Sequence, residues 1–365
     1  MQIAVIAEYN PFHLGHEAML CRLREHFGKD AVLSVILGGT FSQRGEPYIT
    51  TPYVRASAAV RGGANLVVEL PFPYACAPAN TFARAGVEIA KALGADVLAF
   101  GSECADTDKL QTAAERTDSA AFQAELARRL AASPEAGALR LAAALYRERF
   151  GEELPSHAND RLAMAYLRAL CGSGIRPHAV PREAFPSATA IRCAEAPLAE
   201  SVPPYAYALY ADAENKGLFG ADRERLAAAT LLALCNGTAK TEPQKRLSAA
   251  AATARSLNTL LSAAATKAYT NAELSRAATH ALFGVTAAAW EEPVRVVRLF
   301  AADARGCAVL RGVRGVEVLT KPADADKLSD AAQTQFARQS LPERAFALCF
   351  DGEYNYRKAT PEIVK

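Results

Sequence analysis

The first hundred residues of the chain alternate between two hydrophobic patterns. Short, almost unbroken apolar runs are typical of strands in a parallel sheet that is covered on both faces. The stretches between them carry apolar residues three or four positions apart, which indicates amphipathic helices. The predicted strands are residues 3–7, 32–37, 65–70 and 96–100, and the predicted helices are residues 15–27, 53–61 and 80–93. Strand and helix in alternation predict an α/β fold with a doubly wound parallel sheet.

The next hundred residues are mostly helical in pattern. Residues 105–150 predict charged helices that leave the sheet, and residues 161–170 predict another helix. A fifth strand is predicted at residues 177–180, after which Pro186 interrupts the pattern. The hydroxyl-bearing segment at residues 187–192 suits a loop or the start of a helix.

The pattern changes near residue 195. Beyond it, the chain is rich in Ala and Leu, with helices predicted at residues 225–234 and 247–261 and a small β element predicted from residues 294–300 and 308–310. We therefore expect two domains, a sheet-containing domain over residues 1–195 and a mostly helical domain over residues 196–365.

The composition is that of a folded globular protein. Of the 365 residues, 51% are hydrophobic and 22% are charged, which excludes a disordered or collagen-like chain. No apolar run reaches the roughly 18 residues of a membrane helix. Met1 leads directly into the first apolar run without a basic leader. We therefore expect a cytoplasmic protein without a membrane partner.

Charge and cysteine content narrow the functional classes only slightly. Forty-one Lys and Arg residues against 39 Asp and Glu residues leave a net charge of +2, so any nucleic-acid surface must be local. The eight cysteines include no C-x-x-C pair, which argues against a zinc ribbon or a dithiol centre. The candidate basic clusters are Arg22 with Arg24, Arg128 with Arg129, Arg295 with Arg298, and Arg311 with Arg314.

The segment AEYNPFHLGH, residues 7–16, follows the first predicted strand and begins the first predicted helix. Ligands of parallel sheets bind at this edge, and the free N–H groups of a helix N-terminus attract anions. Two residues separate His13 from His16, and Gly15 lets the backbone approach a ligand closely. Both imidazoles can therefore contact one polyphosphate as charge develops on its bridging oxygen. The other four histidines form no recognisable pair, so no protein-bound metal is expected.

Several ordered motifs extend this prediction along the chain. They are FSQRGEP at residues 41–47, GANLVVELP at 63–71, FGSE at 100–103 and SATAIR at 187–192, together with Asn159, Tyr166, Leu167 and Arg182. With YNPFHLGH at residues 9–16, they make the chain similar to the bacterial tRNA(Met) cytidine acetate ligase family, within the HxGH nucleotidyltransferase superfamily. The resemblance covers the first 195 residues well and the rest only diffusely.

The resemblance implies an enzyme that activates acetate with ATP and Mg²⁺ to acetyl-adenylate and then acetylates N4 of the wobble cytidine of elongator tRNA(Met). It implies catalytic roles for His13, His16, Arg44, Thr189 and Arg192. The loop at residues 187–192 would close over the triphosphate, and the second domain would help to hold the tRNA. The implied ATP site comprises Ala7, Glu8, Tyr9, Asn10, Pro11, Phe12, His13, Leu14, Gly15, His16, Glu17, Ala18, Met19, Leu20, Gly101, Asn159, Arg182 and Ser187.

Departures from the family pattern occur at Thr40, Pro52, Asp160 and Glu273. Two of them, Pro52 and Glu273, stand where a basic residue is expected. This loss of positive charge weakens the expectation of RNA binding more than the expectation of ATP binding. Two other functions therefore stay open. One is an adenylyltransferase that acts on a small molecule, and the other is a nucleotide- or RNA-binding relative without turnover.

Three carboxylates follow or end the predicted strands. Glu46 is placed to brace Arg44 by a salt bridge. Glu69 and Glu103 end the third and fourth strands, where each is expected either to face the ligand crevice or to cap a neighbouring helix.

Overall fold

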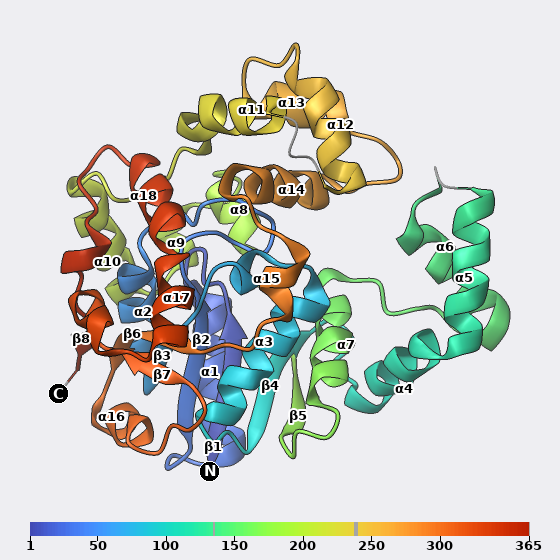
Figure 1. Cartoon of the computed structure of the whole chain (residues 1–365). Coiled ribbons are helices and arrows are strands. Elements are labelled where there is room, and N and C mark those ends of the chain that lie inside the picture. The colour runs from blue at the N-terminus through green and yellow to red at the C-terminus, as the bar shows by residue number, and fades with distance from the viewer. Residues whose placement is uncertain (134–135, 237–239, 365) are drawn as a thin grey trace.

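A central sheet organises the chain (Figure 1). The structure, a computed structural model, describes residues 1–133, 136–236 and 240–364, and within these residues eight strands form one sheet. The order is β5-β4-β1-β2-β3-β6-β7, with β8 paired to β6. The strands are β1 Gln2–Ala7, β2 Val32–Gly38, β3 Leu66–Leu70, β4 Val97–Ser102, β5 Arg176–Pro181, β6 Val296–Ala302, β7 Glu317–Leu319 and β8 Glu362–Ile363. The first five pair in parallel, which confirms the predicted α/β fold and its five N-terminal strands.

Helices cover both faces of the sheet, and this is why its strands are hydrophobic almost throughout. One face packs against α1 (Leu14–Phe27), α2 (Pro52–Arg61) and α10 (Pro204–Asn215) in one hydrophobic cluster. The other face packs against α3 (Ala79–Ala92) and α7 (Ala158–Leu170) in a second cluster. The strands are therefore held between two apolar layers, and their carboxyl ends meet at one edge.

Three helices between β4 and α7 project from the sheet as an arm, on the right of Figure 1. They are α4 (Thr107–Asp118), α5 (Ala120–Ala132) and α6 (Ala138–Phe150). Arg129 of α5 forms an ion pair with Glu148 of α6, which links the two helices, and a second one with Glu125 of its own helix. The arm confirms the predicted charged helical excursion.

A bundle of four helices, here the cap bundle, lies over the edge formed by the carboxyl ends of the strands, at the top of Figure 1. It comprises α11 (Ala227–Cys235), α12 (Glu242–Ala251), α13 (Leu257–Ala264) and α14 (Asn271–Phe283) and has its own hydrophobic core. The helix predicted at residues 225–234 is confirmed. The single helix predicted at residues 247–261 is wrong, because Ser256 caps a new helix there, α13, by accepting from Thr259 N.

The remaining helices are short or lie beside the C-terminal strands. They are α8 Ala188–Arg192, α9 Leu198–Ser201, α15 Ala287–Glu291, α16 Ala304–Leu310, α17 Asp330–Ala337 and α18 Ser340–Leu348, with 3₁₀ turns at Tyr74–Cys76, Arg223–Leu226, Pro322–Lys327 and Tyr356–Lys358.

The late strand-like runs do not form the separate β element that their pattern predicts. The first run is β6, which joins the main sheet antiparallel to β3, with Leu66 opposite Ala302. The second run is helical and belongs to α16, which begins where Asp303 accepts a hydrogen bond from Gly306 N at 2.8 Å. Every residue of β6 is buried, so hydrophobicity alone could not reveal which sheet it joins. The division of the chain at residue 195 stays a prediction.

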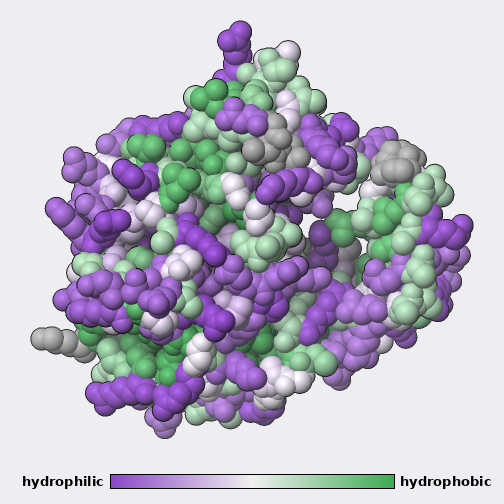
Figure 2. Space-filling model, viewed as in Figure 1, coloured by the Kyte–Doolittle hydropathy of each residue, from purple (hydrophilic) through white to green (hydrophobic). Residues whose placement is uncertain are grey.

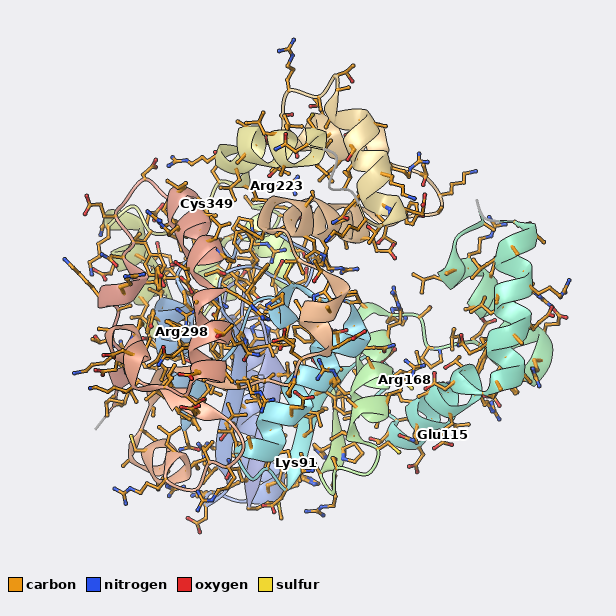
Figure 3. All side chains as sticks on the ribbon, in the orientation of Figure 1. Lys91, Glu115, Arg168, Arg223, Arg298 and Cys349 are labelled. Carbon is orange, nitrogen blue, oxygen red and sulfur yellow. The ribbon has the colours of Figure 1, made fainter. Side chains whose placement is uncertain are left out.

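A buried ion cluster fastens β6 to its neighbours. Arg298 on β6 donates through Nε to Glu69 on β3 at 2.7 Å and through Nη2 to Glu69 and to Glu343 of α18. All three side chains are about 1% exposed. Figure 3 labels Arg298 near the C-terminal helices. Glu69 therefore does not face the ligand crevice or cap a helix, and the predicted basic cluster of Arg295 with Arg298 is wrong.

The face of the molecule that Figure 2 shows carries hydrophilic and hydrophobic residues side by side and is hollowed between the arm and the cap bundle. Across the part of the chain that the structure describes, no helix combines the length and the apolar character needed to cross a membrane.

Candidate functional site

A cavity of about 390 Å³ opens at the carboxyl ends of β1, β4 and β5. Its walls come from the β1–α1 junction, the residues that follow β2, the N-terminus of α7, and the segment from β5 to α8. Polar and apolar side chains share its lining. It is the ligand crevice that the strand order of a parallel sheet creates.

The two histidines lie at the N-terminus of α1 and form its capping box. His13 is the residue before the helix, and its Nδ1 accepts from Gly15 N at 3.0 Å. The Nδ1 atom of His16 accepts from His13 N at 3.2 Å. Their rings stack with centroids 3.7 Å apart. Because both Nδ1 atoms are acceptors, the proton of each neutral ring resides on Nε2.

Both imidazoles are neutral at physiological pH. Burial, together with the charge of Arg182, lowers the pKa of His13 from 6.5 to about 4. Burial lowers the pKa of His16 well below 6.5, and the neighbouring His13 and Arg182 act in the same direction. Each ring therefore lines the cavity as an N–H donor without a positive charge of its own.

A short hairpin after β2 contributes the next wall. Here the binding hairpin is residues 40–48, in which Ser42 N donates to Glu46 O at 2.8 Å and Tyr48 N donates to Thr40 O at 3.0 Å. Glu8, the residue that follows β1, holds the hairpin in place, since its Oε1 accepts from Gln43 N at 2.7 Å. At the tip, Arg44 is exposed and lines the cavity.

The predicted salt bridge between Glu46 and Arg44 is wrong. Glu46 pairs instead with Arg223, at 3.3 Å. Among the described residues, Arg44 has no hydrogen-bond or ion-pair partner, and its guanidinium is available to an anion in the cavity.

Opposite this hairpin, α8 supplies hydroxyls and a guanidinium. Ser187 caps the helix by accepting from Ala190 N at 3.1 Å, so the segment at residues 187–192 is a helix start as well as a cavity wall. Arg192 donates to Asn10 O at 2.7 Å and to Thr189 Oγ1 at 3.4 Å. The bond to Asn10 joins α8 to the β1–α1 junction, while the bond to Thr189 lies within α8.

The fourth wall contains a small polar network. Glu103 Oε1 accepts from Asn159 Nδ2 at 2.8 Å and from Arg182 Nη1 at 3.3 Å. Its other oxygen is buried and has no partner among the described residues. Next to it, a side chain added at Gly101 would meet no atom within 4 Å. The backbone there is open to the cavity, as a closely approaching ligand requires.

Most of the residues that the resemblance implies for the site lie together. Those that line the cavity are Ala7, Glu8, Tyr9, Asn10, His13, Gly15, His16, Ala18, Met19, Arg44, Gly101, Asn159, Arg182, Ser187, Thr189 and Arg192. Pro11, Phe12, Leu14, Glu17 and Leu20 do not line it. Phe12 and Leu20 belong to the hydrophobic core under α1, and Glu17 accepts from Tyr205 OH at 2.7 Å.

Sequence reasoning missed the aromatic part of the lining. Phe82, Phe100, Tyr166 and Phe185 come from four separate segments and meet in the cavity. Such rings offer flat apolar surface to a planar ligand group. No spacing in the sequence brings them together, so only the assembled sheet and helices reveal them.

The four residues that depart from the family pattern each have a role in the fold. Pro52 is the first residue of α2, directly after the cap Thr51, where proline suits a helix. Thr40 is buried at the start of the binding hairpin. Glu273 closes the capping box of α14, accepting from Thr270 N at 2.8 Å. Asp160 Oδ1 accepts from Ser102 Oγ at 2.5 Å and from Cys104 N at 3.0 Å, so it braces the turn after β4.

The cavity does not offer a dedicated metal site. Across the described ranges, no group of three or more His, Cys, Asp or Glu side chains is placed to hold a metal ion. The carboxylates at the cavity, Glu8, Glu46 and Glu183, each have a partner from the protein. A magnesium ion that enters with a nucleotide would therefore be held mainly by phosphate oxygens and water.

Fold and site together define a class of protein, a nucleotidyltransferase-type chain with H-x-G-H at its first strand-to-helix junction. The family model described as HIGH Nucleotidyl Transferase matches residues 1–360, and the chain belongs to this family. It is 41% identical over 189 residues to the tRNA(Met) cytidine acetate ligase of Syntrophotalea carbinolica, which is 49% of this chain and 44% of that relative. The enzyme of the same name from Pediococcus pentosaceus is 53% identical over 105 residues, covering 29% and 28%. These alignments thus span less than half of each relative's length.

The fold is shared over the whole chain. A crystal structure of Thermotoga maritima TmcAL, bound with alpha-thio ATP, superposes with a TM-score of 0.88 at 23% sequence identity and covers 100% of this chain and 99% of its own. An apo form of the same protein gives a TM-score of 0.89 at 22% identity.

Proposed function

We propose that this chain is an ATP-dependent acetate ligase, which forms acetyl-adenylate and transfers the acetyl group to N4 of the wobble cytidine of elongator tRNA(Met) in the cytoplasm. The observation that carries the proposal is the convergence of His13, His16, Arg44, Thr189 and Arg192 on one cavity at the N-terminus of α1. The names of the relatives support the acceptor, and the alpha-thio ATP bound by the Thermotoga maritima protein supports ATP as the substrate.

In the first step, a carboxylate oxygen of acetate attacks the α-phosphorus of ATP, and the bond to the bridging oxygen of pyrophosphate breaks. In the second, N4 of the cytidine attacks the acyl carbon, the bond to AMP breaks, and the amine releases a proton to solvent or a phosphate oxygen. Neither step needs a covalent intermediate with the protein.

The residues of the cavity stabilise charge in the first step. His13 and His16 donate Nε2–H groups to the phosphate oxygens, and the N-terminus of α1 adds its partial positive charge. Arg44 and Arg192 approach from opposite walls and supply the full charges that the neutral imidazoles lack. Mg²⁺ would accompany the triphosphate and neutralise the leaving pyrophosphate.

The wall that contains Gly101, Asn159 and Tyr166 suits the nucleoside. The open backbone at Gly101 and the ring of Tyr166 offer a flat surface to adenine. In the same wall, Asn159 and Arg182 each donate a hydrogen bond to Glu103.

One assay tests the proposal against its alternatives. The purified chain is incubated with ATP, Mg²⁺ and acetate, with or without tRNA(Met), and pyrophosphate and N4-acetylcytidine are measured. We expect pyrophosphate release that requires acetate, and acetylcytidine only when the tRNA is present. A stable product that retains the AMP moiety would instead identify a small-molecule adenylyltransferase. ATP binding without pyrophosphate release would identify a relative without turnover.

A further inference from the structure

The cap bundle contacts the binding hairpin through two hydrogen bonds from α14. Arg276 Nη1 donates to Gln43 O at 2.9 Å, and Thr279 Oγ1 donates to Gly45 O at 2.6 Å. Two consecutive turns of one helix thus hold carbonyls on either side of Arg44, which stands between them in the sequence. Neither Arg276 nor Thr279 lines the main cavity itself.

The approach of the hairpin to α14 is unusually close. Gly45 has a φ of +80°, and a side chain added there would stand 2.5 Å from Arg276 Cα. Only glycine combines this backbone conformation with such proximity. Below the tip, Phe41 packs against Phe283 near the end of α14, with ring centroids 5.1 Å apart.

The hairpin is therefore held from two sides. Glu8 accepts from Gln43 N on the sheet side, while Arg276 donates to Gln43 O on the cap-bundle side. The peptide groups around Gln43 are thus fixed in direction, which directs Gln43 and Arg44 toward the cavity. Gln43 Nε2 is buried there without a partner among the described residues, as a donor reserved for a bound molecule would be.

From this geometry we propose that Arg276 and Thr279 are positioning residues of the nucleotide site, which hold the binding hairpin so that Arg44 contacts the phosphates of the bound nucleotide. The inference rests on the proposed function, because it takes the cavity to be the ATP site. It makes α14 a part of that site, although the helix lies more than two hundred residues from His16 in the sequence.

The test measures ATP affinity by calorimetry without any RNA. Arg276→Met keeps the apolar stem but removes the donor, and Thr279→Val removes the hydroxyl at nearly constant volume. We expect Arg276→Met to weaken ATP binding by about 10- to 100-fold, the range for losing one hydrogen bond from a charged group. Thr279→Val should weaken it by about 2- to 10-fold, because its hydroxyl donates to a neutral carbonyl. Arg255→Met is the matched control, because Arg255 is an exposed arginine of the same bundle whose side chain has no partner among the described residues, and it should bind ATP as the wild type does.

A double-mutant cycle separates positioning from general stability. If Arg276 acts through Arg44, then Arg276→Met should cost nothing further in a chain that already carries Arg44→Ala. Full additivity of the two losses would overturn the inference, as would an Arg276→Met chain that binds ATP normally and fails only in RNA acetylation. A wild-type chain that does not bind ATP would overturn the proposed function itself, so the two failures are distinguishable.

Discussion

At the scale of single residues, backbone N–H groups decide which ring nitrogen of His13 and His16 carries the proton. Each Nδ1 accepts from the first turn of α1, and burial keeps each ring neutral. The positive charge of the site therefore resides on arginines, while the histidines add short-range donors that gain strength as the phosphate becomes more anionic.

Replacing His16 tests this division of roles. His16→Ala removes one Nε2–H donor, and we expect acetate-dependent pyrophosphate release to fall roughly 100- to 1,000-fold, as for the loss of a donor to a developing oxyanion. His26→Ala is the matched control, since His26 is exposed near the other end of α1. Equal rates for both variants and the wild type would remove His16 from the mechanism.

Asp160 allows a second prediction at this scale. Its carboxylate is 2% exposed and holds the turn after β4, and its position in the first turn of α7 favours negative charge. Asp160→Ala leaves two buried donors unsatisfied, so we expect unfolding to require about 1–3 kcal/mol less and the KM for ATP to rise. Asp160→Asn keeps the Oδ1 acceptor and should rescue the KM, which urea titration and steady-state kinetics together would check.

At the scale of elements, the start of α14 is fixed by its capping box. Thr270 and Glu273 satisfy each other's backbone N–H groups, and this explains why an acidic residue stands where the family pattern expects a basic one. Since Arg276 lies in the second turn of the same helix, fraying of the first turn reaches the residue that holds the binding hairpin.

Thr270→Ala should therefore have two linked effects. We expect a loss of about 1 kcal/mol in the free energy of unfolding, the usual cost of an N-cap. We also expect a smaller rise in the KM for ATP than Arg276→Met causes. Thr241→Ala, which removes the same kind of capping box from α12, should cost similar stability without changing the KM. Identical kinetic effects of both changes would contradict the link between α14 and the site.

At the scale of the whole molecule, buried neutral histidines couple stability to pH. His13 and His280 both have their pKa lowered by burial from 6.5 to about 4. His280 lies on α14 of the cap bundle, one turn after Arg276, and its ring is hydrogen bonded to the carbonyl of Cys76. In the unfolded chain these rings titrate near 6.5, so the unfolded state binds more protons below that pH.

Stability should consequently fall as pH decreases from 6.5 to about 4. Each histidine is expected to contribute on the order of 3 kcal/mol over this window, at about 1.4 kcal/mol per pH unit. Urea unfolding followed by circular dichroism at several pH values would measure the slope. His280→Gln keeps a donor for the Cys76 carbonyl but does not titrate, so it should reduce the slope by the share of His280 while the share of His13 remains. An unchanged slope would show that His280 is not responsible.

The local pattern of the sequence determined the alternation of strands and helices in the N-terminal half of the chain. It also determined the central segment of the site. β-branched runs and amphipathic stretches are short-range signals, and the segment at residues 7–16 carries its chemistry within a single strand-to-helix junction. In the same way, a glycine marked the end of β4 at Gly101, and a hydroxyl residue marked the start of α8 at Ser187. These features depend on neighbours in sequence, so they can be read without the fold.

Only the tertiary structure decided which distant segments meet. β6 is buried throughout, and it pairs with β3, where Arg298 meets Glu69 in a buried ion pair. The aromatic wall of the cavity and the grip of α14 on the binding hairpin are likewise contacts between residues far apart in the chain. Such contacts depend on complementary shape and on the satisfaction of buried polar groups, which exist only once the layers have packed.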